Sequence, residues 1–375
     1  MKIRAFLFIF ILAGISLCSS CHYENDDEQT IYVPVEDPEP EPEIEWSEMY
    51  KMALKNTNCY IVKPGETVSI PIMKAYAVWT IYADKLGDTG FSQSIPLPEV
   101  LWQDAQGLIT KINLAKDVDY KNSSIQVAIA NNVRGNAVIA IKFDDTVRWS
   151  WHIWVTDYDP KNQINGKTYN WDNNNDGIVD YIWMDRNLGA QTNGSALTYT
   201  DSLAACGLLY EWGRKDPFVG DKILKNTNKA EDGDFDTKPI FDISDNLLPE
   251  SGLAESGKGV RSEYINKDYT VSNMAKSIIN PMVFYIGHFD SSNSSWGDWY
   301  KPEDGDFDHQ LWGESGEKSP FDPCPEGWRV PAYKNELNPW AGMDNATTPH
   351  SLLGVFPKGG FRYIHTNGAI KNSGF

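Results

Sequence analysis

Short runs of apolar residues separated by turn residues recur along the segment 46–160, and one of them alternates hydrophobic and polar positions with the period of two that is typical of a half-buried β-strand. The clearest run covers residues 147–156 (VRWSWHIWVT), where every odd position is apolar and most even positions are polar. The Asp144-Asp145 pair before it predicts a tight hairpin. Regularly spaced strands separated by turns predict an all-β sandwich over residues 46–160. The other strands are expected at residues 59–62, 67–72, 124–130 and 136–143.

The chain after residue 160 has a different pattern, in which long polar segments separate short apolar ones. Residues 157–166 form the predicted boundary, and residues 201–209 predict a short helix. Residues 219–316 are rich in Asp, Asn, Ser and Gly and contain the hexapeptide EDGDFD twice, at 231–236 and 303–308. These segments are interpreted as solvated loops. Weak calcium binding by the hexapeptides is the alternative.

The start of the chain, residues 1–45, predicts export and a tether. Lys2 and Arg4 precede an apolar stretch at residues 5–17, which is too short to span a bilayer comfortably. Small residues stand directly before Cys21, as in a bacterial lipoprotein signal, so Cys21 is the predicted lipidation site and residues 1–20 the signal peptide. A plain secretory signal is the alternative. Residues 21–45 are rich in acidic residues and alternate Pro and Glu at 38–43, which predicts a stiff acidic spacer.

The composition adds limits on partners and chemistry. The formal net charge is −19, which disfavours binding to a nucleic-acid backbone. The chain has 14 Trp and 18 Tyr, and these large side chains need either burial or a role at a surface. No GxSxG, HExxH or phosphate-loop motif is present, so the sequence does not predict an enzyme.

Residues 172–180 (DNNNDGIVD) resemble the start of a calcium loop, because oxygen-bearing side chains recur at alternate positions around a central glycine. The tentative ligands are Asp172, Asn174, Asp176 and Asp180. A glutamate is missing at the twelfth position of the loop, where Trp183 stands. The alternative is a turn in which the side chains bond their own backbone.

Three long motifs in a fixed order, with the short INPMVF, DWY and LW between the last two, carry a family resemblance: WMDRNLGA at 183–190, GLLYEWGRKDPF at 207–218 and DPCPEGWRVP at 322–331. This order resembles the Fibrobacter succinogenes major paralogous domain, which occurs in surface lipoproteins and fimbrial tip-like proteins of Bacteroidetes. The resemblance implies an α+β, loop-rich C-type-lectin-like domain over residues 161–375. It also implies that strands expected after Phe375 are lacking. Residues 46–160 are similar to the sandwich module that often precedes this domain.

The resemblance implies framework roles for the motif residues. We interpret the arginines as ties that hold loops through backbone carbonyls and Asp. Gripping a ligand carboxylate is the alternative. The framework set is Asp185, Arg186, Asn187, Trp212, Arg214, Trp328 and Arg329.

The cysteines and the one histidine in the long predicted strand allow simple interpretations. Cys206 and Cys324 are the two cysteines of the second domain, and export would permit a disulfide between them. Two buried thiols are the alternative. Cys59 is interpreted as a buried thiol, and His152 as a packed histidine instead of a metal ligand.

Four aromatic residues among acids and amides are candidates for a sugar-binding surface: Trp296, Trp299, Tyr300 and Trp312. The alternative is that these rings pin loops to the core. Together these features predict a non-enzymatic, lipid-anchored protein of the outer membrane or cell surface, working as a fimbrial tip or accessory adhesin-like subunit with other fimbrial subunits. The alternative is a stand-alone surface lipoprotein that binds a glycan or a host protein.

Overall fold

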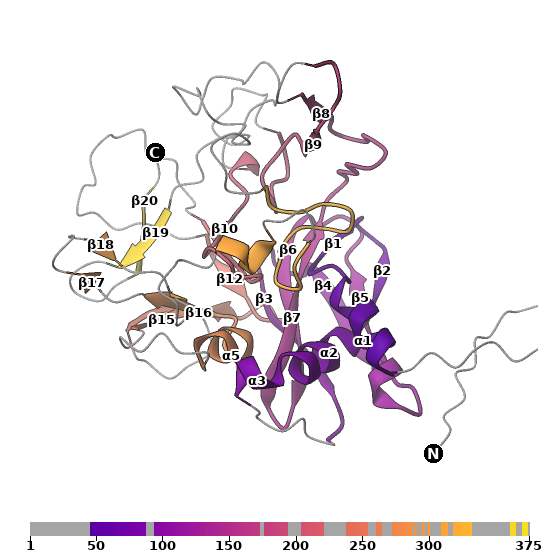
Figure 1. Ribbon diagram of the computed structural model, residues 1–375, viewed down its shortest axis with the longest axis vertical. Helices are drawn as coiled ribbons and strands as arrows, with labels where there is room; N and C mark the ends of the chain where they lie inside the picture. The colour runs from indigo at the N-terminus through magenta and orange to yellow at the C-terminus, as the bar shows by residue number, and fades with distance from the viewer. Residues whose placement is uncertain are drawn as a thin grey trace, which may run out of the picture. The chain divides into compact units, whose positions relative to one another are not determined.

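The computed structural model describes most of residues 46–331 and two short segments beyond them (Figure 1). The chain divides into two units, Met1–Met49 and Tyr50–Phe375, and of the first unit only residues 46–49 are described. The predicted signal peptide, Cys21 and the tether therefore lie outside the described residues. The described ranges are 46–87, 94–172, 176–193, 204–220, 238–253, 260–264, 272–286, 289–290, 295–296, 299–300, 309–313, 318–331, 361–364 and 370–373.

The described residues form mostly β-strands in several sheets, with few helices and many loops, which is an α+β organisation. The helices are α1 (Trp46–Leu54), α2 (Met73–Ile81), α3 (Ala83–Leu86), α5 (Ser272–Ile279) and the 3-10 turns η1 (Tyr120–Asn122) and η2 (His309–Trp312). The strands are β1 (Cys59–Val62), β2 (Thr67–Pro71), β3 (Leu97–Gln103), β4 (Ile109–Ala115), β5 (Ser124–Ile129), β6 (Gly135–Phe143), β7 (Thr146–Val155), β8 (Thr168–Trp171), β9 (Tyr181–Met184), β10 (Leu208–Tyr210), β11 (Pro217–Val219), β12 (Ile240–Phe241), β13 (Leu247–Leu248), β14 (Glu250–Leu253), β15 (Val260–Tyr264), β16 (Val283–Ile286), β17 (Phe289–Asp290), β18 (Ser295–Trp296), β19 (Phe361–Ile364) and β20 (Ile370–Ser373).

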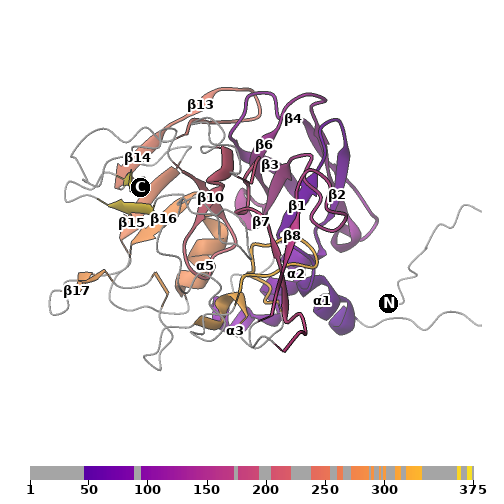
Figure 2. The same cartoon turned by 90° about the horizontal axis from the view of Figure 1, so that it is seen from above.

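The largest sheet has six strands in the order β1-β7-β6-β3-β12-β13. β1 runs parallel to β7, with Cys59 opposite His152, and the other neighbours in this sheet are antiparallel. A second sheet has the order β2-β5-β4. Figure 2 shows β13 beyond β3 in the first sheet, so strands from residues 240–248 extend a sheet that is built mainly from residues 59–155.

The sequence pattern located five strands of the segment 46–160 correctly, namely β1, β2, β5, β6 and β7. The expectation of strands alone over this segment is wrong, because α1, α2 and α3 also lie there, and β3 and β4 were not predicted. α2 gave no amphipathic signal because it is buried on nearly all sides, including Lys74, Tyr76 and Trp79. A helix buried all round has no polar face and so no helical period to recognise.

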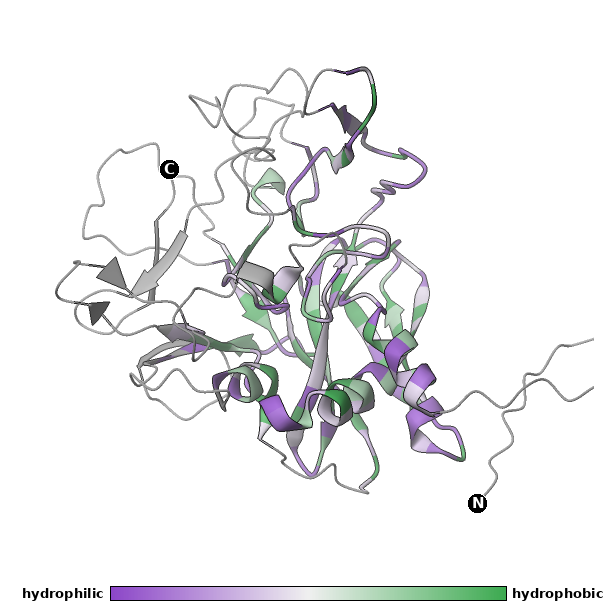
Figure 3. Cartoon of the chain, in the orientation of Figure 1, coloured by the Kyte–Doolittle hydropathy of each residue, from purple (hydrophilic) through white to green (hydrophobic). Residues whose placement is uncertain are grey.

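The expectation that residues 147–156 form a half-buried strand is also wrong. Every position of β7 from Val147 to Val155 is buried, the polar ones included. β7 lies between β1 and β6, and α2 and α5 also contact it. Figure 3 shows pale and purple stretches, as well as green ones, within the long strands of this sheet. The alternation in the sequence therefore reflects two faces of β7 that are both buried, one lined by apolar side chains and the other mostly by polar ones.

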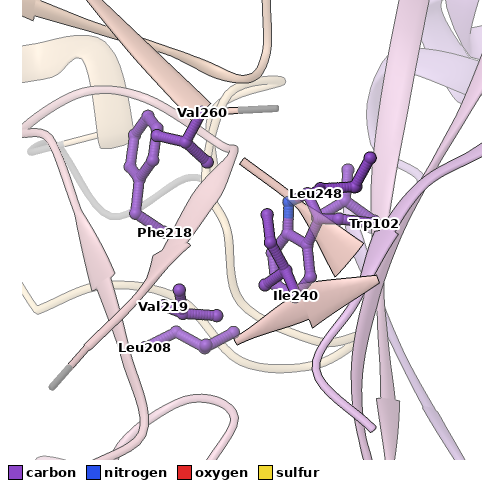
Figure 4. Close-up of a cluster of buried hydrophobic side chains, with 8 residues drawn as sticks. Trp102, Leu208, Phe218, Val219, Ile240, Leu248 and Val260 are labelled. Atoms are coloured by element: carbon purple, nitrogen blue, oxygen red, sulfur yellow. The ribbon is translucent and has the colours of Figure 1, made fainter. Parts of the chain in front are cut away.

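One hydrophobic cluster joins this sheet to later segments (Figure 4). Trp102 of β3 and Val138 of β6 lie in one cluster with side chains from β10 to β15. Burial of each such side chain contributes about 1.5–3 kcal/mol, so this cluster fastens the two parts of the chain together. The later members are Leu208, Phe218, Val219, Ile240, Leu248 and Val260.

Gly189 is expected to be essential for this packing. Its φ is +80°, and an added Cβ would lie 2.6 Å from Cγ of Leu208 and 2.9 Å from Oδ1 of Asn136. Gly189→Ala should lower the free energy of unfolding by about 2–5 kcal/mol, the sum of left-handed strain and overpacking. Urea denaturation measures the loss.

Gly327→Ala is the matched control, because Gly327 has a φ of +79° and nothing within 4 Å of an added Cβ. It should lose only the strain, about 1–2 kcal/mol. Equal losses in the two variants would contradict the steric explanation.

Candidate functional site

A buried polar network lies along β7, where the even-numbered side chains meet the 207–218 motif. The Ser150 hydroxyl donates to Oδ1 of Asp216 at 2.6 Å, and the Lys215 ammonium donates to Ser150 and to both carboxylate oxygens of Asp216. All three residues are buried. Burial lowers the pKa of Lys215, and the Asp216 carboxylate partly opposes this shift. The network satisfies polar groups that would otherwise destabilise the fold.

His152 continues this network along β7. Its Nε2 lies 3.0 Å from Oδ1 of Asn136, and its Nδ1 lies 3.4 Å from the Tyr210 hydroxyl. The side-chain amide of Asn136 donates to the Gly189 carbonyl at 3.0 Å. His152 is 1 % exposed, and burial lowers its pKa from 6.5 to about 3. The structure thus places His152 as a packed, neutral histidine that links β7 to two of the three motifs.

A second polar group lies around Asn58, directly before β1, and reaches the 322–331 motif. The Asn58 amide donates to the carbonyls of Pro320 and Asp322 at 2.7 and 2.8 Å, and its oxygen accepts from the Trp149 indole at 3.1 Å. The buried ammonium of Lys74 donates to a backbone carbonyl, that of Asn56. Burial, with repulsion from Lys318 and Lys215, holds the pKa of Lys74 well below its usual range.

The framework arginines tie loops together, as in the structural interpretation of the motifs. The Arg186 guanidinium lies 3.8 Å from the centre of the Tyr158 ring and donates to Asp185 and to the carbonyls of Asn165 and Gln191. Such planar multidentate bonding is characteristic of arginine.

Arg214 and Arg329 use the same chemistry in other loops. Arg214 pairs with Glu211 and donates to the carbonyl of Val283. Arg329 donates to the carbonyl of Gly313 at 3.0 Å. These bonds use part of the donor capacity of each guanidinium within the fold.

The remaining framework residues also make internal contacts. Asp185 accepts the backbone N–H of Lys167 at 2.9 Å, and the Asn187 amide donates to the carbonyl of Cys206 at 3.2 Å. The ring centres of Trp212 and Trp312 lie 4.7 Å apart. Trp328 packs on a core cluster of Cys59, Trp154, Tyr158 and Met184.

The predicted aromatic surface is wrong for two of its four residues. Trp299 is 5 % exposed and Trp312 is 8 % exposed. Their indole N–H groups donate to the carbonyls of Trp212 and Arg214, so these rings pin loops and do not face solvent. Tyr300 is half-buried against Trp299, with the ring centres 5.6 Å apart. Trp296 belongs to β18, but its side chain lies outside the described residues.

In the proposed calcium loop, backbone N–H groups donate to the side-chain carboxylate of Asp172. Oδ1 of Asp172 accepts the N–H of Asp176 at 3.1 Å, and Oδ2 accepts the N–H of Gly177 at 2.7 Å. Asp180 is exposed, and Asn174 lies outside the described residues. Among the residues that the structure describes, no group of three or more His, Cys, Asp or Glu side chains is placed to hold a metal. Side chains of this segment thus bond its own backbone, as in the alternative interpretation of a turn, and calcium binding stays a prediction.

The cysteines 59, 206 and 324 are all free thiols in the structure. It therefore does not contain the disulfide between Cys206 and Cys324 that was one interpretation of this pair. Cys206 is half-buried, whereas Cys59 and Cys324 are buried. Burial raises the pKa of both buried thiols.

A small cavity of about 10 Å³ lies between α5 and the 207–218 motif. Arg214, Lys215, Asp216 and Ser277 line it together with apolar residues. This volume is close to the minimum that holds a single water molecule. The cavity can therefore solvate the polar network but cannot accommodate a sugar.

Sequence reasoning missed the polar residues that organise these contacts, above all Asn58, Lys74 and Asn136. Their partners lie far away along the chain, so no local spacing reveals them. The one available signal is a single lysine inside the apolar run of α2, which indicates a buried and satisfied amine.

Comparison with protein-family models, with curated proteins and with solved structures gave no match. The family resemblance of the three motifs therefore stays an expectation. In the described residues, no helix has the length and apolar character needed to cross a membrane.

The burial of His152 predicts a pH dependence of stability. Because its pKa falls from 6.5 to about 3 on folding, only the unfolded chain takes up this proton between those values. The free energy of unfolding should therefore decrease by up to about 1.4 kcal/mol per pH unit as pH falls through this window, and this contribution should be constant above it.

Urea denaturation of the parent protein and of His152→Gln across pH 3.5 to 8 measures this dependence. The difference between the two curves gives the contribution of His152 to the pH dependence, because the carboxylates and Lys74 contribute to both curves. Parallel curves below about pH 6.5 would show that His152 titrates normally in the folded protein.

The Asp172 turn should hold without calcium. A chelator is expected to leave the melting temperature unchanged, and Asp172→Asn should reduce the free energy of unfolding by about 0.5–1.5 kcal/mol through the loss of one amide bond. The exposed Asp145 provides the control, since Asp145→Asn makes the same change of charge at another turn. A melting temperature that calcium raises in the parent protein but not in Asp172→Asn would favour the metal instead.

Proposed function

We propose that this chain is a non-enzymatic, lipid-anchored protein of the outer membrane or cell surface, acting as a fimbrial tip or accessory adhesin-like subunit. Its partners would be other fimbrial subunits, and Cys21 would carry the lipid. The proposal includes a β-sandwich over residues 46–160 and a C-type-lectin-like domain over residues 161–375.

The observation that carries this proposal is the use of the three motifs as scaffolding. Arg186, Arg214 and Arg329 direct their donors at backbone carbonyls and at neighbouring carboxylates. His152, Ser150 and Asn58 fasten the same motifs to β7 and β1. Such an arrangement supports a rigid, loop-rich subunit whose working surface lies on loops outside this framework.

The two sheets of the segment 46–160 support the sandwich proposal. The six-stranded sheet and the β2-β5-β4 sheet both contain buried aliphatic side chains, such as Ile139 in the first and Val127 in the second. β3 and β4 contact each other, and the backbone N–H of Ile109 bonds the Gln103 side chain at 2.9 Å. Two sheets linked in this way are consistent with a shared core.

The start of the chain supports surface anchoring. Lys2, Arg4 and the apolar residues 5–17 precede Cys21, and an acidic Pro/Glu segment follows it. This segment is also the observation that favours the second candidate function, a stand-alone surface lipoprotein that binds a glycan or a host protein. A stiff spacer would hold such a binding domain away from the membrane.

Cell fractionation tests the choice between these two functions. Surface fibres sheared from native cells and washed outer membranes are blotted for the protein. The fimbrial role predicts enrichment in the fibre fraction, and a signal only in the membrane fraction would overturn it in favour of the stand-alone binder.

Two cysteine variants test the anchor in the same cells. Cys21→Ser should release the protein from the membrane, whereas Cys18→Ser should leave it attached, because Cys18 follows the bulky Leu17. Retention of Cys21→Ser in washed membranes would contradict lipidation at this residue.

A further inference from the structure

Cys59 and Cys324 belong to chain segments that lie side by side, although they are far apart in the sequence. Cys59 begins β1, and it forms a parallel bridge with Pro325, the residue directly after Cys324. The Thr57 hydroxyl lies 2.9 Å from the carbonyl oxygen of Cys59 and 2.8 Å from that of Cys324. One side chain thus contacts the backbone of both cysteines.

The bridge places the two cysteines close together in space. Neighbouring strands lie about 4.8 Å apart, and Cys324 is one residue from Pro325, which pairs with Cys59. Disulfides have their Cα atoms most often at about 5.5–6 Å. Cys324 lies in a bend and not in a regular strand, so the alternation of side chains in a strand does not direct it away from Cys59.

Both thiols are buried in the same region of the fold. Cys59 and Cys324 are buried, and burial together with both thiols raises the pKa of the Tyr210 phenol. Lys318 donates to the Cys324 carbonyl and to Asp322, so this region is held by several bonds. The two thiols are therefore enclosed, and the segment around Cys324 is held in place by these bonds.

We infer that Cys59 and Cys324, which are free thiols in this structure, form a structural disulfide in the exported protein. The step is a thiol–disulfide exchange: a disulfide-bearing oxidant of the exporting compartment accepts two electrons and two protons and becomes a dithiol. The two cysteine thiols lose them, and one S–S bond forms between Cys59 and Cys324. The inference rests on the proposed export but not on the proposed adhesive role.

The exchange has to occur before the core closes. The attacking species is a thiolate, and burial in the folded chain both shields these sulfurs and raises their pKa values. The bond therefore forms during folding, when the start of β1 meets the 322–331 motif. Once formed, it closes a loop that contains nearly the whole described fold and so restricts the unfolded chain strongly.

Cys206 is the competing partner from sequence alone. It is half-buried, and its carbonyl is held by the Asn187 amide in a different segment, between β9 and β10. No bridge joins that segment to the residues around Cys324 among the described pairings. The geometry therefore favours Cys59.

Refolding with peptide mapping tests the inference. Protein purified from native cells is unfolded, reduced and refolded with reduced and oxidised glutathione, then alkylated in denaturant and digested. The expected result is one linked pair of peptides containing Cys59 and Cys324, with Cys206 alkylated. Free Cys59 and Cys324, or a link from either of them to Cys206, would overturn the inference.

Variants and the untreated native protein complete the experiment. Cys206→Ser should keep the link, and Cys59→Ser should leave Cys324 alkylated even in a folded protein. Reduction of the refolded protein should lower its melting temperature, and an unchanged value would contradict a structural role. A linked refolded protein beside a fully reduced native protein would count against the proposed export while supporting the pairing.

Discussion

The burial of β7 on both faces is the constraint on which the rest of the structure depends. A strand with Ser150, His152 and Arg148 along it can be buried only if other segments supply partners for its polar groups. Those partners come from residues 210–216, from Asn136 on β6 and from α2, where Arg148 lies over the Trp79 ring. The chain after residue 160 is therefore required to complete the packing of a strand that precedes it.

Buried charge strengthens this dependence. Lys74, Lys215 and Arg214 are all buried, and each donates to carbonyl or carboxylate oxygens. Removing one partner of such a group costs about 3–5 kcal/mol, because an uncompensated charge is left inside. The sequence-based boundary near residue 160 stays a prediction, but the contacts across it are of the kind that make the two parts fold together.

The aromatic residues of the second part of the chain serve this packing as well. A tryptophan combines a large apolar surface with one N–H donor, and a loop-rich fold has many backbone carbonyls that need such a donor. Trp299 and Trp312 meet that need, which is why they are buried where a sugar-binding surface was expected. Their neighbours in the sequence are acidic and polar, so the local composition indicated exposure.

The sequence by itself determined the features that depend on near neighbours. Five strands of the segment 46–160 follow from short apolar runs between turn residues, and the turn after Asp172 follows from side chains that bond amides four and five positions away. Only the tertiary structure decided the helix α2, the second buried face of β7 and the neighbour of each cysteine. These depend on contacts such as Trp149 with Asn58 and Thr57 with Cys324, which join residues 91 and 267 positions apart. Such pairings are selected by the packing of the whole chain, and no local pattern records them.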